Sequence, residues 1–390
     1  MDAKPGGPVN LAPNSLRLLD KLGVYKKLRG RGYQFSEGIY RDEDGRMVGV
    51  SPFGGKAWGY ECVRIERAEL LDVLKEELQA RGTEVEYSCS LREVVSEHAA
   101  DGVLFHVRKG DKASGKIVEM RTDMLIGCDG VHSKTRTFVL GGHEVLPTYV
   151  GSVMLAAKCR WPRLRFGDTF AECQKNDERA LGIMTRKGGL IMLPSDPAGE
   201  IELYARQFQI PDLGREGWEN MDADKTRLVE MMKSEIEEYP DLVQSMLEQA
   251  QEKDIYIWAI HTLPKIKKWI SAGYRAIVIG DAAHTISPAA GQGANQAIED
   301  AYTLGQVIAR ETVSEPQHAL QKKLNIWQAH RSDRVDRVAN LSIQLMNSRL
   351  PPEERAKLSP DLVYDLSGAQ EDQVERLRWL FAPNLMEREM

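Results

Sequence analysis

The chain has 390 residues, enough for two domains, and its composition of 42% hydrophobic and 28% charged residues is typical of a globular enzyme. A net charge of −6 argues against a nucleic-acid surface, which needs clustered Lys and Arg to neutralise phosphates. We find neither an apolar run of the ~18 residues that a membrane helix needs nor the apolar region of a secretory signal, and five irregularly spaced cysteines lack any zinc pattern. These features favour a cytoplasmic protein without a metal site.

The first 130 residues predict short helices and strands. Asn14 or Ser15 can cap a helix that ends at Gly23. A second helix is expected over 67–80, with its leucines on one inward face, and the apolar run 124–127 is typical of a buried parallel strand. The predicted inward leucines are Leu70, Leu71, Leu74 and Leu78, and further strands are expected at 85–87, 102–107 and 116–120.

The middle of the chain changes character. Alternating apolar residues at 190–193 and 201–206, separated by a turn at 195–199, predict an antiparallel sheet with one face on a core. A helical pattern over 224–251 is interrupted near Pro240, and its methionines are expected in the core. Tyr204 and Arg206 share a face and either activate a phenolic substrate or form an ordinary pair within the sheet, so no catalytic base is assigned.

Parallel-strand character returns at 276–279, which indicates that the middle domain is inserted between two pieces of the first. The expected division is 1–148 and 273–314 for a cofactor-binding domain, 149–272 for a substrate domain, and 315–390 for a helical C-terminal region. The fold class is therefore α/β, with a parallel sheet and an inserted antiparallel sheet.

The segment GDAAHTISPAAGQGANQAIEDA, residues 280–301, leads from the strand at 276–279 into a helix. Asp281 follows the strand, at the sheet edge where open α/β sheets bind ligands, and can accept hydrogen bonds from sugar-like hydroxyls. Gly291 to Asn295 open the helix, whose free N–H groups suit an electron-rich oxygen. The alternative is that Asp281 caps a turn and His284 is an ordinary packed histidine.

A second strand that runs into an acidic turn lies some 150 residues earlier, at 123–136. It carries Asp129 and Gly130 in the string CDGVHSKTR. Two such units on one sheet predict a shared ligand cleft.

At these residues the sequence resembles the class A flavoprotein monooxygenases, which have the fold of para-hydroxybenzoate hydroxylase, and looks most similar to fungal FAD-dependent members. GDAAH with PAAGQGANQAIED is similar to the family's second FAD fingerprint, and CDGVHSKTR to its Asp-Gly motif. The resemblance extends through IERAELL at 65–71 and PNSLR at 13–17. It implies FAD, NAD(P)H as reductant, O2, and hydroxylation or epoxidation of an aromatic or polyketide-like molecule in secondary metabolism.

The resemblance also implies roles for individual residues. Asp281 would bind the ribityl hydroxyls of FAD, Pro288 would lie against the isoalloxazine, and Arg67 would contact the flavin or its diphosphate. Asp129 and Gly130 would support the flavin site and transient NAD(P)H binding. Backbone N–H groups at the N1–C2 carbonyl side of the flavin would come from Gly291, Gln292, Gly293, Ala294 and Asn295. For each residue the alternative is a cap, a surface salt bridge or a turn.

The sequence departs from the family pattern in one respect. The family's fold opens with a strand, a G-x-G-x-x-G loop and a helix, which bind the pyrophosphate of FAD, and this unit is not found here. The first 60 residues contain only the Gly pairs at 6–7 and 54–55, so the Rossmann-like sheet is expected to be incomplete, with exposed strand edges and apolar faces. A truncated sequence is the favoured explanation. The alternatives are weak FAD binding or a non-catalytic binding or scaffold protein. A flavin-dependent halogenase is disfavoured because residues 258–264 do not match its W-x-W-x-I-P motif.

Overall fold

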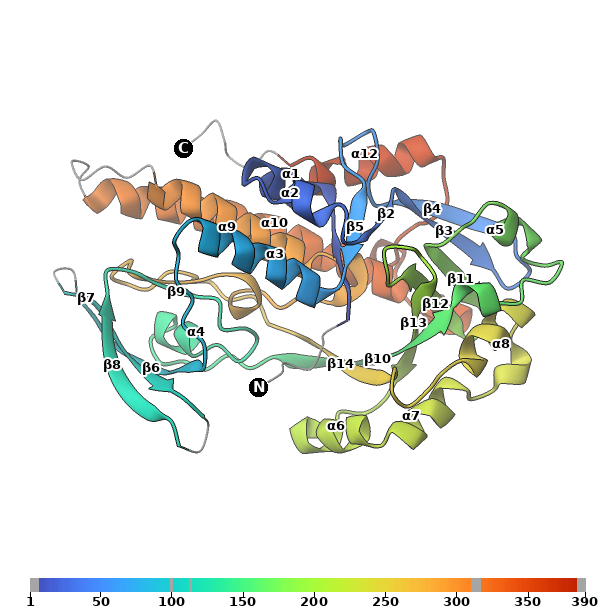
Figure 1. Ribbon diagram of the computed structural model, residues 1–390, viewed down its shortest axis with the longest axis horizontal. Helices are drawn as coiled ribbons and strands as arrows, with labels where there is room; N and C mark the ends of the chain where they lie inside the picture. The colour runs from blue at the N-terminus through green and yellow to red at the C-terminus, as the bar shows by residue number, and fades with distance from the viewer. Residues whose placement is uncertain (1–6, 99–100, 112–113, 310–316, 384–390) are drawn as a thin grey trace.

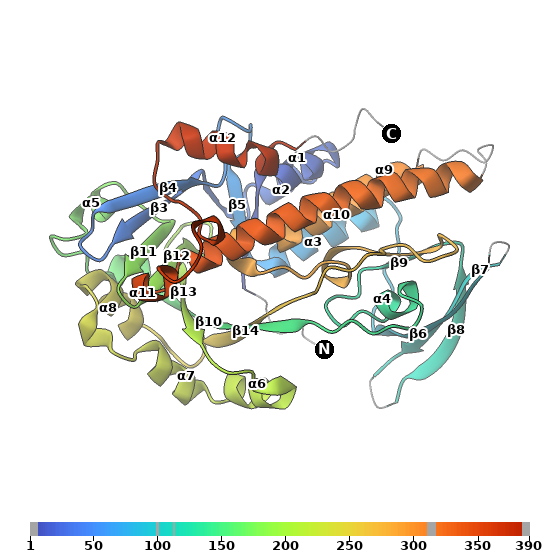
Figure 2. The same cartoon turned by 180° about the vertical axis from the view of Figure 1, so that it is seen from behind.

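Two lobes make up the computed structural model, which describes residues 7–98, 101–111, 114–309 and 317–383 (Figure 1). A large, mainly antiparallel sheet forms the lobe at the right of Figure 1, and smaller sheets lie in the other lobe. The helices α9 (Gly293–Ala309) and α10 (Gln317–Asn347) run side by side over the lobe that contains β6 to β9 (Figure 2). This arrangement confirms the predicted α/β class and the helical C-terminal region.

The large sheet has seven strands in the order β14-β10-β13-β12-β11-β3-β4. Neighbouring strands are antiparallel except β11 and β3, which are parallel. The sheet therefore contains the alternating segments at 190–193 and 201–206, as predicted, together with a hairpin from the N-terminal part of the chain. Its strands are β3 (Glu37–Asp42), β4 (Met47–Pro52), β10 (Thr148–Arg160), β11 (Leu181–Thr185), β12 (Gly188–Pro194), β13 (Ile201–Gln209) and β14 (Tyr256–Thr262).

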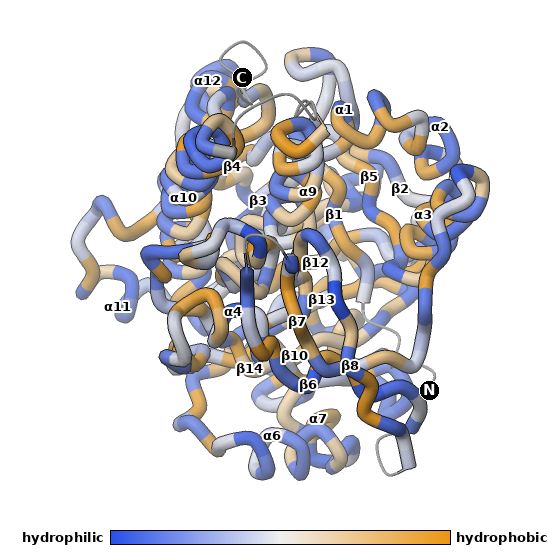
Figure 3. The backbone as a smooth tube through the Cα atoms, turned by 90° about the vertical axis from the view of Figure 1, so that its left-hand side faces the viewer, coloured by the Kyte–Doolittle hydropathy of each residue, from blue (hydrophilic) through white to orange (hydrophobic). Residues whose placement is uncertain are grey.

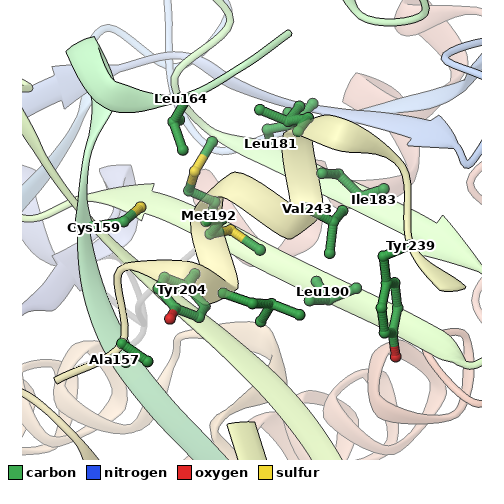
Figure 4. Packing of buried hydrophobic residues seen from close by; sticks show 14 of the residues in the cluster. Ala157, Cys159, Leu164, Leu181, Ile183, Leu190, Met192, Tyr204, Tyr239 and Val243 are labelled. Carbon is green, nitrogen blue, oxygen red and sulfur yellow. The ribbon is translucent and has the colours of Figure 1, made fainter. Parts of the chain in front are cut away.

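Short helices cover one face of this sheet and enclose an apolar core (Figure 4). The helical pattern predicted over 224–251 is two α-helices separated by a break before Pro240, and Met232 and Met246 are fully buried, as expected. The covering elements are α5 (Ala171–Lys175), α6 (Gly214–Ala223), α7 (Lys225–Met232) and α8 (Asp241–Glu248), with 3-10 turns η1 (Trp161–Arg163) and η2 (Ile236–Glu238).

In the other lobe, β9 (Leu125–Gly127) and β15 (Ala276–Val278) pair in parallel, with Gly127 opposite Val278. The pairing confirms that two segments far apart in the sequence share one sheet. The prediction that β9 is fully buried is wrong, because Ile126 is 41% exposed and no strand of the described chain pairs with the outer edge of β9. An open edge of this kind agrees with the expected incomplete parallel sheet.

The remaining strands form two three-stranded sheets, β1-β5-β2 and β6-β7-β8. The central strand β7 shows apolar orange segments in Figure 3, and its Val103, Phe105 and Val107 are buried. Residues 85–87, predicted as a strand, are a loop, because no neighbouring strand offers them hydrogen bonds in the described structure. The strands are β1 (Val9–Leu11), β2 (Tyr33–Phe35), β5 (Cys62–Ile65), β6 (Cys89–His98), β7 (Gly102–Lys109) and β8 (Lys116–Thr122).

The outer helices include one that departs from its predicted burial. Helix α3 has the expected bounds, yet Leu71 is 52% and Leu78 is 38% exposed, and its fully buried residue is Val73. Leu70 and Leu74 are partly buried against the core cluster that contains Val73, so the inward prediction holds for these two leucines and is wrong for Leu71 and Leu78. No helix among the described residues is long and apolar enough to cross a bilayer. The outer helices are α1 (Pro13–Lys21), α2 (Tyr25–Leu28), α3 (Arg67–Ala80), α4 (Lys134–Val139), α11 (Pro352–Arg355) and α12 (Gln370–Phe381), with the 3-10 turn η5 (Pro360–Leu362).

Candidate cofactor site

The turn after β15 presents Asp281 to solvent. Gly280 has φ +58 and begins the 3-10 turn η3 (Gly280–Ala282); a Cβ there would lie 3.2 Å from the Cβ of Ala297. No group of the described chain donates a hydrogen bond to the Asp281 carboxylate. Partial burial raises the pKa of Asp281, and the positive charges of His284 and Arg67 oppose that rise. Its oxygens are therefore free to accept hydrogen bonds from a ligand.

The loop before α9 brings backbone groups to the same region. The 3-10 turn η4 (Pro288–Ala290) ends at Gly291, whose φ of +62 favours glycine. The N–H groups of Gly293 and Ala294 then belong to the first turn of α9, which provides no acceptors for them within the helix. A Cβ at Gly293 would meet no atom within 4 Å, so there is open space beside these groups. An anionic or carbonyl oxygen could bind there.

The side chains of Gln292 and Asn295 point into the protein and are buried. Asn295 Oδ1 accepts hydrogen bonds from Ala12 N and Ser15 Oγ, and its Nδ2 donates to Asn10 O and Gly291 O. Gln292 Oε1 accepts from the side-chain nitrogens of Asn14 and Gln296. These two side chains hold the loop against the N-terminal segment, so only their backbone faces a ligand.

Asp129 lies at the end of β9 and caps α4. Its carboxylate accepts hydrogen bonds from Ser133 Oγ at 2.5 Å, Lys134 N at 2.9 Å, and both the N–H and the hydroxyl of Thr135. The alternative interpretation of Asp129, a helix cap, therefore fits its contacts. The following Gly130 has φ +75 and open space around its Cα.

The turns that carry Asp129 and Asp281 leave the same edge of the parallel pair. Ile279 N donates to Gly127 O at 3.1 Å, and Arg136 Nη1 donates to Ala282 O at 3.0 Å. The predicted convergence of two acidic turns from distant parts of the chain is thus present in the backbone.

Arg67 begins α3 directly after β5, and its side chain is exposed. It lowers the pKa of Asp281 and that of Tyr256, in both cases against burial, which raises them. The positive charge of Arg67 therefore acts on both groups, and its contact with a flavin or diphosphate stays a prediction.

Tyr204 and Arg206 lie away from this region, on the face of β13 that packs against α7 and α8. Tyr204 is fully buried in the apolar core (Figure 4), and Arg206 donates to Met232 O at 2.7 Å and to Tyr239 Oη at 2.9 Å. The ordinary structural pair is the correct interpretation.

Sequence reasoning missed the buried charged residues behind the loop. Asn14 Nδ2 donates to Glu299 Oε1 at 2.6 Å, and His284 Nε2 lies 2.5 Å from Asp300 Oδ2. The signal was an acidic pair, Glu299 and Asp300, inside an otherwise uncharged helix, facing two arginines three residues apart on α10, Arg331 and Arg334.

A small pocket lies on the other side of the Pro288–Ala290 turn. Strands β3 and β4, the turn itself, and the helices α10 and α12 supply its mainly apolar wall. The lining residues are Tyr40, Ser51, Pro52, Phe53, Ala289, Ala290, Leu341, Leu345, Arg349, Tyr364, Leu377, Leu380 and Phe381.

The chain is similar in sequence to known monooxygenases and hydroxylases. Asperlicin C monooxygenase of Petromyces alliaceus is 24% identical over 330 residues, covering 82% of this chain and 69% of that protein. Hispidin-3-hydroxylase of Neonothopanus nambi is 25% identical over 352 residues, covering 86% and 78%.

Solved structures share the fold. A salicylate hydroxylase substrate complex aligns with a TM-score of 0.72 at 18% identity, covering 97% of this chain and 89% of that one. Klebsiella pneumoniae HpxO with FAD and uric acid aligns with a TM-score of 0.68 at 20% identity, covering 96% and 84%. The sequence profile described as FAD binding domain matches residues 9–342, most of the chain. The chain therefore belongs to this FAD binding domain family, that of the class A flavin monooxygenases.

Proposed function

We propose that this protein is an FAD-dependent monooxygenase that uses NAD(P)H and O2 to hydroxylate or epoxidise an aromatic or polyketide-like small molecule. Family membership supports FAD as the cofactor. The curated relatives described above are a monooxygenase and a hydroxylase, which supports catalysis over a scaffold role. Both come from fungi, and the name of the first matches the expectation of secondary metabolism.

The described residues fit the flavin end of FAD. The observation that carries the proposal is the free carboxylate of Asp281 beside the open first turn of α9. The carboxylate can accept hydrogen bonds from ligand hydroxyls, and the N–H groups of the helix can donate to a ligand carbonyl, so one planar ligand with both kinds of group fits the site. Arg67 adds a positive charge to the same region. When bound, the flavin would accept a hydride from NAD(P)H and activate O2, chemistry that side chains do not supply.

The roles of the chain's own residues follow from their contacts. Asp281 would hold ribityl hydroxyls, the N–H groups of Gly293 and Ala294 would hold a flavin carbonyl, and Arg67 would neutralise negative charge. Gln292 and Asn295 would keep the loop in place without touching the cofactor. Asp129 would act indirectly, by fixing the start of α4 beside Gly130, where NAD(P)H is proposed to approach.

The small pocket beside the Pro288–Ala290 turn has aromatic walls, but it has room for little more than a water molecule in this structure. Tyr40, Phe53 and Tyr364 line it, and Arg349 adds a cationic group whose Nη2 donates to Ala289 O at 3.1 Å. The proposed substrate class therefore rests on the names of the curated relatives.

Titration of the purified protein with FAD tests the proposal. Wild type should develop the flavin absorption band and oxidise NAD(P)H faster when aromatic compounds are added. Asp281→Asn should weaken FAD binding about 10-fold or more, since it removes a charged acceptor, whereas the exposed Asp168→Asn in the other lobe should bind as wild type does. A protein that retains no flavin absorption band after excess FAD has been removed would contradict the proposal.

A further inference from the structure

The carboxylate of Asp300, fully buried on α9, reaches back to the turn that carries Asp281. Its Oδ2 accepts a hydrogen bond from Gly280 N at 2.9 Å and lies 2.5 Å from His284 Nε2, while Oδ1 accepts from Arg331 Nε at 2.7 Å. Gly280 and His284 flank the segment that contains Asp281. One carboxylate therefore ties both ends of the turn to one point on α9.

The charge state of this carboxylate fixes the direction of the hydrogen bonds. Burial raises the pKa of Asp300, but His284 and Arg331 outweigh burial and bring it to about 2. An ionised carboxylate only accepts, so His284 Nε2 carries a proton and donates it to Asp300. Both contacts to the turn are thus charge-assisted.

Asp300 is itself held by a buried network of ion pairs and hydrogen bonds. Arg331 also pairs with Glu299 and donates to the side-chain oxygen of Gln296 at 2.8 Å. Arg334 joins Glu299 to the end of α12, donating to Trp379 O and Leu380 O, each at 2.8 Å. This network joins α9, α10 and α12, so the position of Asp300 does not depend on the turn.

We propose that Asp300 is a positioning residue for FAD binding, which fixes the turn from Gly280 to His284 so that Asp281 presents its carboxylate to the cofactor. The inference rests on the proposed function. If the ion pair served only to join α9 to α10, the bond to Arg331 would suffice. The second carboxylate oxygen, Oδ2, instead contacts only Gly280 N and His284 Nε2, both in the turn.

The test compares Asp300→Asn with Glu178→Gln. Glu178 is a matched control because it also forms a buried carboxylate–arginine pair, with Arg41 Nε at 2.8 Å and Nη2 at 2.6 Å, in the other lobe. Both variants should lower the unfolding midpoint. Asp300→Asn should also weaken FAD binding, measured by fluorescence titration, about 10-fold or more, while Glu178→Gln should stay within about 2-fold of wild type.

A second readout needs no cofactor. Backbone amides in the turn 280–284 should exchange hydrogen faster in Asp300→Asn than in wild type, while those of β15 keep their protection. Wild-type exchange in that turn, or unchanged FAD affinity in Asp300→Asn, would overturn the inference. Failure of wild type to bind FAD would instead contradict the proposed function. The hydrogen-exchange result would then still test whether Asp300 fixes the turn.

If Asp300→Asn does not fold, His284→Gln replaces it. This change leaves the Asp300–Arg331 pair intact, and it alters the contact with the turn together with the packing of His284 on Trp269. It should reduce FAD affinity with a smaller loss of stability than Asp300→Asn, and wild-type affinity in a folded His284→Gln would count against the inference.

Discussion

Asn295 accepts a hydrogen bond from the backbone N–H of Ala12 at 2.9 Å, which joins positions 283 residues apart in the sequence. The same side chain contacts Ser15, Asn10 and Gly291, so all of its hydrogen-bonding groups are used. The N-terminal segment and the candidate cofactor loop are thus joined, although no pattern in either segment predicts that the two are in contact.

Asn295→Ala should destabilise the protein by roughly 2–4 kcal/mol, because it leaves several buried backbone and hydroxyl groups without partners. Chemical unfolding monitored by circular dichroism measures this. The exposed Asn176→Ala, which loses one 3.4 Å contact, should change stability by less than about 0.5 kcal/mol. Equal losses in the two variants would contradict the role given to Asn295.

Tyr204→Phe should leave stability unchanged or raise it slightly. The Tyr204 hydroxyl is buried and has no hydrogen-bond partner in the described structure, so removing it relieves a desolvated polar group. Monooxygenase turnover should also be unaffected. A large loss of turnover in a fully folded Tyr204→Phe would restore the discarded idea that this tyrosine activates a phenol.

Glu202 should make the protein less stable as the pH rises. Burial raises the pKa of Glu202 from 4.5 to about 9, against the attraction of Arg179 and Arg64. The unfolded chain therefore releases this proton above about pH 4.5, while the folded chain keeps it until about pH 9. The contribution of the protonated Glu202 to the free energy of unfolding is fully present below pH 4.5, and it is lost as the pH rises towards 9.

Glu202→Gln should remove this dependence and stabilise the protein at pH 8 by roughly 2 kcal/mol, with little effect at pH 4. Neither oxygen of Glu202 has a hydrogen-bond partner among the described residues, so the neutral amide replaces an already neutral acid. Denaturant titrations of both proteins at several pH values give the comparison. A constant difference across that range would show that the carboxyl is ionised in the folded state.

Two substitutions on α3 test whether its leucine face is covered. Leu71→Glu should cost less than about 0.5 kcal/mol, because the side chain is 52% exposed. Val73→Ala on the same helix should cost about 2 kcal/mol, since Val73 is completely buried. A larger cost for Leu71→Glu would mean that this face is covered in solution, and sedimentation of wild type and variant would show whether a second copy covers it.

The order of elements could be predicted from the sequence because each depends on local spacing. Alternation identified the strands around Leu190 and Tyr204, leucine spacing identified α3, and the glycines of the 280–301 segment marked the start of α9. The same segment, with Asp129 and Arg67, also identified the family. These features persist wherever the segment lies in the fold.

Only the tertiary structure decided what each polar side chain does. Asp129 was predicted to support the ligand site, and its carboxylate accepts hydrogen bonds from the start of α4, whereas Asp300 was not singled out from the sequence, and its carboxylate accepts a hydrogen bond from Gly280 N in the turn of Asp281. Leu71 looked like core and is exposed. The physical reason is that spacing defines which face a residue lies on, but its partner and burial are set by the distant segment that packs there.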